Sequence, residues 1–159
     1  MAKLKIYLDT SVISAYFDFR KPLRQLITQK WFQNELKNLI PFVSSLVFEE
    51  IDAHPDNEAR MEMLAILDDH GIKMLEINEE ILQIANLYRK NVIPKAINDS
   101  IHLAVAAYYE LDAIASWNFK HIVNLETIKA IHKINKLNGL AAVEIVTIEN
   151  LGGDKYGSL

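Results

Sequence analysis

Short apolar runs alternate with longer amphipathic segments along the chain. The apolar runs are KLKIYLD, IPFVS, IKMLEI, LDAIAS and VEIVTIE, which begin at residues 3, 40, 72, 111 and 143. Runs of this length predict β-strands, and the segments between them have the length and spacing of helices. This alternation favours a mainly parallel sheet with helices on both faces. We therefore expect a three-layer α/β/α sandwich, with one domain over residues 1–150 and a flexible tail over 151–159.

The segments between the apolar runs carry the start and stop signals of helices. Thr10 or Ser11 can cap the first helix, and Asn98 can cap the helix that contains Asp99. Gly71 follows the end of another helical segment, in the position that favours a left-handed residue. The expected helices cover residues 10–18, 22–39, 45–53, 56–70, 78–91, 98–110 and 125–139.

Composition excludes several classes of protein. No uncharged apolar stretch approaches the roughly 18 residues that a membrane span requires. Lys5 and Asp9 interrupt the N-terminal apolar run that a secretory signal would need. The chain has no cysteine, which excludes thiolate metal sites and cysteine nucleophiles. We expect a cytoplasmic protein without a membrane partner.

The net charge of −4 argues against a simple basic nucleic-acid-binding protein. The charge is nevertheless uneven, because residues 1–40 carry +4, 41–87 carry −9, 88–140 carry +3 and 141–159 carry −2. One interpretation is ordinary solvated helix faces. The other is a basic rim around an acidic centre, which would suit a phosphate backbone held over metal ions.

Two polar residues follow expected strands at their carboxyl ends. Asp9 directly follows the first strand, and Asn118 follows LDAIAS, the fourth. An isolated buried carboxylate is too costly to keep ionised, so Asp9 must be solvated, paired or bound to a metal. Parallel sheets collect their functional groups at this edge. Asn118 is equally a common turn residue.

Two further carboxylates are candidates because of the helices that carry them. With about 100° between successive helical residues, Glu50 lies in the apolar arc between Leu46 and Val47, whereas Glu49 projects toward solvent. Asp99 is the only formal charge in AINDSIHLAVAAYY, a helix apolar enough to be buried. The alternative for Asp99 is stabilisation of the first helical turn.

His102, three residues after Asp99, is within hydrogen-bonding reach of it. A single histidine on a buried helix is more often a satisfied core residue than a ligand. Three carboxylates that converged without a cation would repel one another strongly. Oxygen ligands of this kind suit Mg²⁺ or Mn²⁺, which can activate water against a phosphodiester.

Four motifs now form a recognisable series: IYLDTS, SSLVFEEI, NDSIHLAVA and LDAIASWNFKHI. In order and spacing they resemble the four acidic motifs of PIN-domain ribonucleases, and most nearly the VapC-type toxins of toxin–antitoxin pairs. The resemblance extends over about residues 4–148. It implies a parallel sheet in the order 3-2-1-4-5 and Mg²⁺- or Mn²⁺-dependent endonucleolytic cleavage of RNA. It also implies a homodimer that an antitoxin protein silences.

The resemblance also assigns roles to individual residues. Asp9 would be the central metal ligand, Asp99 a second direct or water-mediated ligand, and Glu50 a ligand or the residue that positions the attacking water. The fourth acidic position of the family is Asn118 here, which lacks the charge for a second metal. Side chains that would hold the metal-bound water or the RNA phosphate are Thr10, Ser11 and Lys120. His121 is as well explained by a structural role.

Two other functions are consistent with the residues alone. The chain could be a catalytically weak PIN-like module that binds RNA or a protein partner, which the neutral Asn118 and the acidic net charge favour. It could also accept phosphate on Asp9, as receiver and haloacid-type proteins do at the end of their first strand. The haloacid pattern requires a second Asp at the position of Ser11.

Overall fold

The computed structural model describes residues 2–152, so most of the expected tail over 151–159 lies outside the described residues. Five strands are present in residues 2–152: β1 Lys5–Leu8, β2 Ile40–Ser44, β3 Lys73–Leu75, β4 Ala113–Ala115 and β5 Glu144–Val146. They form one sheet in the order β3-β2-β1-β4-β5. Every adjacent pair is parallel, which confirms the expected order and strand direction.

This strand order distinguishes the fold from that of receiver domains, one of the alternatives considered for Asp9. Receiver domains have the order 2-1-3-4-5, in which the first strand neighbours the third. Here β1 lies between β2 and β4, at the centre of the sheet. The receiver-type assignment is therefore wrong, although that fold also ends its first strand in Asp.

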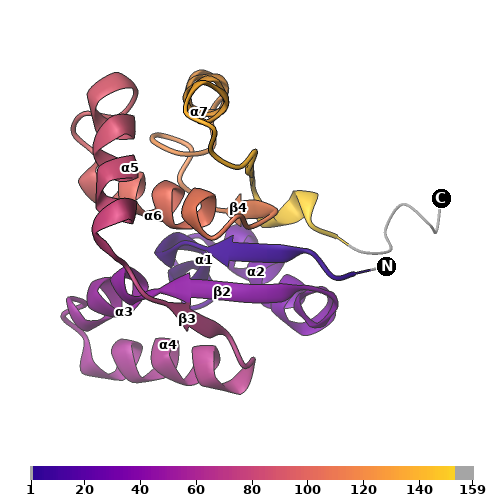
Figure 1. Cartoon of the computed structure of the whole chain (residues 1–159). Helices are drawn as coiled ribbons and strands as arrows, with labels where there is room; N and C mark the ends of the chain where they lie inside the picture. Colours follow the sequence, from indigo (N-terminus) through magenta and orange to yellow (C-terminus); the bar gives the residue numbers. More distant parts are fainter. Residues whose placement is uncertain (1, 153–159) are drawn as a thin grey trace.

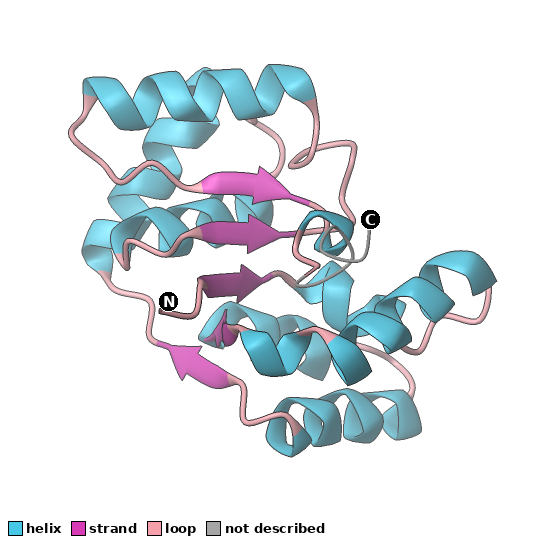
Figure 2. Cartoon of the chain, turned by 90° about the vertical axis from the view of Figure 1, so that its right-hand side faces the viewer, coloured by secondary structure: helices cyan, strands magenta, loops and turns pink. Residues whose placement is uncertain are grey.

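The helices fall into two groups that cover the two faces of the sheet. In one group α1 contacts α2, α3 and α4, and in the other α5 contacts α6 and α7. Figure 1 shows α5, α6 and α7 in the upper half and α3 and α4 in the lower half, and Figure 2 shows the strands enclosed by helices. Their bounds are α1 Thr10–Ala15, α2 Pro22–Asn34, α3 Ser45–Asp52, α4 Asn57–Asp69, α5 Glu79–Asn91, α6 Ile97–Tyr108 and α7 Leu125–Leu137, with 3-10 helices at Leu36–Asn38 and Ile148–Asn150.

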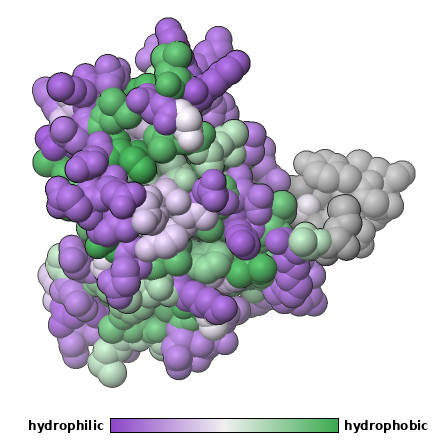
Figure 3. Space-filling model, in the orientation of Figure 1, coloured by the Kyte–Doolittle hydropathy of each residue, from purple (hydrophilic) through white to green (hydrophobic). Residues whose placement is uncertain are grey.

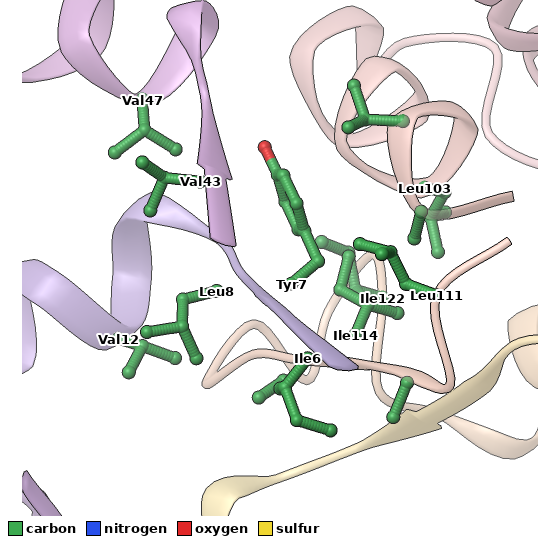
Figure 4. Close-up of a cluster of buried hydrophobic side chains, with 14 of the residues drawn as sticks. Ile6, Tyr7, Leu8, Val12, Val43, Val47, Leu103, Leu111, Ile114 and Ile122 are labelled. Atoms are coloured by element: carbon green, nitrogen blue, oxygen red, sulfur yellow. The ribbon is translucent and has the colours of Figure 1, made fainter. Parts of the chain in front are cut away.

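The central strand β1 is buried on both faces. Successive side chains of a strand point to opposite faces, so Ile6 and Leu8 contact one helical layer and Tyr7 contacts the other. All three are fully buried. Figure 4 shows the Tyr7 ring directed away from Ile6 and Leu8, into the space between α3 and α6, with its hydroxyl at the tip. β1 thus places one polar atom deep in an apolar layer.

Most side chains on the face shown in Figure 3 are hydrophilic, with smaller apolar patches between them. Large apolar side chains that are exposed include Phe19, Leu23 and Leu125. None of the helices within residues 2–152 has the length and apolar character needed to span a membrane.

α1 and α3 begin at the expected residues, but the residues that cap the helices differ from the expected ones. Asp9 itself, not Thr10 or Ser11, caps α1, because its carboxylate accepts the Ser11 backbone N–H. Ser44 caps α3. α6 begins at Ile97 without a side-chain cap, so the capping role expected for Asn98 is also wrong.

Other elements are shorter than expected. β3, β4 and β5 have three residues each, and α2 ends at Asn34 because a separate 3-10 helix follows it. The expected strands were defined by their apolar runs, whereas strand length depends on where neighbouring strands stop pairing. This pairing is a property of the tertiary structure.

Gly71 closes α4 with a left-handed backbone, φ 61°. An added Cβ would meet no atom within 4 Å, so the cost of Gly71→Ala is the backbone conformation alone. We expect this substitution to lower the free energy of unfolding by about 1 kcal/mol. Urea denaturation would measure it, with Asp69→Ala at the exposed end of α4 as control. An unchanged midpoint for Gly71→Ala would contradict the strain argument.

Candidate active site

The candidate site lies where β1 and β4 end, at the carboxyl edge of the sheet. The parallel register pairs Leu8 with Ala115, so the residues that follow, Asp9 and Ser116, meet. The Asp9 backbone N–H donates to the Ala115 carbonyl at 3.2 Å. The Ser116 hydroxyl donates to Asp9 Oδ2 at 2.8 Å. Parallel α/β sheets place their functional groups at this edge.

Asp9 is buried at the centre of the site, with only 3% of its surface exposed. Its Oδ1 accepts hydrogen bonds from the Ser11 backbone N–H, at 2.9 Å, and from the Ser11 hydroxyl. Burial raises the pKa of Asp9, and the electrostatic interaction with His102 and the hydrogen bonds from Ser11 and Ser116 offset only part of this increase. A nearby cation would remove the remaining cost of the buried charge.

Thr10 and Ser11 each donate to a carboxylate of the site. The Ser11 hydroxyl donates to Asp9 and accepts the Trp117 backbone N–H at 2.8 Å. The Thr10 hydroxyl donates to Glu50 Oε1 at 2.6 Å. Both residues therefore belong to the cluster, as supports of the carboxylates. Direct contact of either hydroxyl with phosphate or metal-bound water stays a prediction.

Glu50 reaches the site from α3, whereas its neighbour Glu49 is exposed. This orientation confirms the helical-wheel prediction. Glu50 Oε1 accepts from Thr10 and from His102 Nε2, the latter at 2.7 Å, and Oε2 accepts from Asn98 Nδ2 at 3.3 Å. Although burial would raise the pKa of Glu50, these hydrogen bonds and the electrostatic interaction with His102 together outweigh it and lower the pKa. Glu50 is therefore held as a carboxylate.

His102 contacts Glu50 and not Asp99, so its expected partner is wrong. Its Nδ1 lies 2.5 Å from the Tyr7 hydroxyl. With 2% exposure and a partner on each ring nitrogen, His102 is a satisfied buried histidine whose hydrogen bond reaches the site.

Asp99 and Asn118 complete the cluster. Asn118 Nδ2 donates to Asp99 Oδ2 at 3.2 Å, and the Asn118 backbone N–H donates to Ser116 Oγ at 2.9 Å. Burial raises the pKa of Asp99, and the electrostatic interactions with His102 and His121 offset this only in part, because the charges of Asp9 and Glu50 raise it further. Asn118 Oδ1 accepts the His121 backbone N–H at 3.0 Å, so Asn118 has the expected turn role and contacts a site carboxylate as well.

The carboxylates of the site fit some of the requirements of a divalent ion. Across residues 2–152, no three His, Cys, Asp or Glu side chains form a group that could hold a metal ion. Direct ligation by Asp9, Glu50 and Asp99 together therefore stays a prediction. Mg²⁺ needs fewer protein ligands than three, because it keeps several of its waters and binds through one or two carboxylates. Asp9 and Asp99, joined through Ser116 and Asn118, fit that requirement.

A groove of about 670 Å³ is lined by residues that directly follow Asn118 in the chain and by residues shortly before Asp99. Lys95, Lys120, His121 and Phe119 line it, and both lysines are exposed. Lys120 is therefore placed where it could meet an anionic ligand that enters from this side. Trp117, by contrast, is buried, and its Nε1 donates to the Thr28 hydroxyl at 3.0 Å.

Three residues of the cluster were not predicted from the sequence. Ser116 follows β4 as Asp9 follows β1, and that equivalence could have identified it. Tyr7 could have been suspected as the polar side chain of a buried strand. Asn98 gave no signal apart from its expected role as a cap.

A family model described as PIN domain matches residues 6–122, which is more than half of the chain. No curated protein matches the sequence. Among solved structures, VapC20 of Mycobacterium tuberculosis, a toxin that cleaves the sarcin-ricin loop, is similar with 10% identity and a TM-score of 0.56, covering 73% of this chain and 92% of its own.

A second similar structure is VapBC2 of Rickettsia felis, solved with a DNA fragment from its promoter. It has 12% identity and a TM-score of 0.53, covering 90% of this chain and 97% of that one. At such low identity, both similarities concern the fold alone. The family match, the strand order and the placement of Asp9 at the end of the central strand agree with one another. The chain belongs to the PIN domain family.

Proposed function

We propose that the chain is a Mg²⁺- or Mn²⁺-dependent endoribonuclease. The observation that carries the proposal is the line of contacts from Asp9 through Ser116 and Asn118 to Asp99. It gathers two carboxylates of raised pKa from separate elements at one edge of the sheet. Such a pair is costly unless a cation neutralises it.

Each residue then has a role toward RNA. Asp9 and Asp99 would hold the ion, and Glu50, held as a carboxylate, would bind and orient the attacking water through Oε2. When bound, the ion lowers the pKa of water and stabilises the leaving oxygen. Lys120, exposed in the adjacent groove, would contact an RNA phosphate.

The fold similarity suggests a biological setting. Both similar structures are named for VapBC systems, one as a toxin and the other as a complex. We infer that this chain is the toxin of a type II toxin–antitoxin pair, acts in the cytoplasm as a homodimer, and is silenced by an antitoxin at the same groove. An adjacent gene for a small DNA-binding protein would support this inference.

One observation favours a second function, a PIN-like module that binds RNA or a partner without cleaving it. Asn118 replaces the fourth acidic residue of the family, and its amide oxygen is used by the His121 backbone. The site therefore lacks one charge with which to hold a second metal. RNA binding without turnover in both Mg²⁺ and Mn²⁺ would favour this function.

The nuclease proposal predicts a sharp difference between two adjacent residues. Glu50→Gln should lower Mn²⁺-stimulated RNA cleavage by at least about 100-fold, because it removes the charge that orients water. Glu49→Gln, on the exposed side of the same helix, should leave the rate unchanged. A gel assay with end-labelled RNA would measure both rates, and circular dichroism would check the fold.

Asp9→Asn and Asp99→Asn should abolish cleavage under the same conditions. Each removes one of the two carboxylates that would hold the ion, while keeping the size of the side chain. Undiminished cleavage by both variants would refute the proposal.

The raised pKa of Asp99 predicts a pH-dependent gain in stability. Because the folded state raises this pKa, ionised Asp99 destabilises the metal-free protein at neutral pH. Asp99→Asn should therefore raise the melting temperature at pH 7 in EDTA. The gain should vanish below about pH 3.9, where Asp is protonated in both states. Glu62→Gln, exposed on α4, is the control, and a gain independent of pH would contradict the electrostatic cause.

A further inference from the structure

A chain of hydrogen bonds runs from the core to Glu50. The Tyr7 hydroxyl lies 2.8 Å from Ser44 Oγ and 2.5 Å from His102 Nδ1, and His102 Nε2 lies 2.7 Å from Glu50 Oε1. These four residues come from β1, the end of β2, α6 and α3. In Figure 4 the Tyr7 hydroxyl points between α3 and α6, the helices that carry Glu50 and His102.

The direction of each hydrogen bond follows from the groups at the two ends. The Glu50 carboxylate only accepts, so His102 Nε2 must donate to it. In a neutral imidazole Nδ1 then accepts, and the Tyr7 hydroxyl donates to it. Ser44 Oγ accepts the Leu46 backbone N–H and has its own proton for the Tyr7 oxygen. In this series of hydrogen bonds, each group thus donates to the next one in the direction of Glu50.

This arrangement makes the two oxygens of Glu50 unequal. Oε1 accepts from both Thr10 and His102, at 2.6 and 2.7 Å. Within residues 2–152, Oε2 accepts only the longer bond from Asn98, at 3.3 Å, and Asn98 is exposed. The oxygen with free capacity to accept is therefore Oε2.

We propose that His102 is a positioning residue, held by Tyr7, which fixes Glu50 so that Oε2 alone serves the reacting water. The inference rests on the proposed nuclease function, in which Glu50 orients that water. A carboxylate free to rotate would present either oxygen in several orientations, and catalysis loses rate when a reacting group is misplaced. In metal sites, loss of a residue that orients another in this way lowers metal affinity or activity by about 10–100-fold.

Substitution of His102 separates this role from simple core packing. His102→Leu fills the buried site with an apolar side chain, so packing is largely retained, but it removes the donor to Glu50. We expect its kcat for RNA cleavage to fall about 10–100-fold, with KM for RNA unchanged. His102→Gln keeps an N–H near the position of Nε2 and should recover most of that loss. Both variants should be assayed well below their melting temperatures.

A control histidine lies on another helix of the same layer. His132 on α7 is half-buried, and its Nε2 lies 3.0 Å from the Val143 carbonyl. His132→Gln should change stability without changing kcat. A kcat for His102→Leu equal to that of the wild type, or a His102→Gln variant as slow as His102→Leu, would overturn the positioning role.

The tautomer of the His102 imidazole can be measured independently of enzymatic activity. In the metal-free protein at pH 8, ¹⁵N NMR of labelled histidine should show His102 with its proton on Nε2. Tyr7→Phe should keep the proton there, because the Glu50 carboxylate still accepts from Nε2. A proton on Nδ1 in the wild type would overturn the inference. Because this spectrum needs neither RNA nor metal, it separates the two failures: an inactive wild type refutes the nuclease function, and the wrong tautomer refutes the positioning.

Discussion

The structure depends on a buried carboxylate at the end of its central strand. Asp9 caps α1 through Oδ1 and joins β1 to the residue after β4 through Oδ2. One side chain therefore sets the direction of the first helix and connects two strands at the functional edge. The serines that satisfy it, Ser11 and Ser116, do not neutralise it, and its pKa stays raised. The remaining charge is what makes this edge suited to a cation.

A second interaction joins the two helical layers. α3 belongs to the group around α1, and α6 to the group around α5. Tyr7, on the central strand between them, contacts His102 of α6, which in turn contacts Glu50 of α3. The geometry of Glu50 thus depends on how the two layers pack. A candidate catalytic group placed in this way is as rigid as the core beneath it.

The fold was more predictable than its boundaries. Apolar runs and helical spacing identified every strand and the parallel sheet, since burial on both faces requires continuous apolar segments. The strand order came only from the resemblance to PIN domains. The apolar runs and helical spacing did not identify the caps, because Asp9 rather than Thr10 or Ser11 caps α1, and α6 begins before Asn98 without a side-chain cap. Backbone geometry at a strand end decides which of several neighbouring polar residues can cap a helix.

The sequence by itself determined the fold class and three carboxylates, Asp9, Glu50 and Asp99, because an ionisable group in an apolar run or arc is visible in the pattern. Only the tertiary structure decided which groups satisfy them. The contact of Ser116 with Asp9 spans 107 residues, and that of His102 with Tyr7 spans 95. No local pattern encodes such pairs, since they exist only once the parallel strands align and the two helical layers close over them.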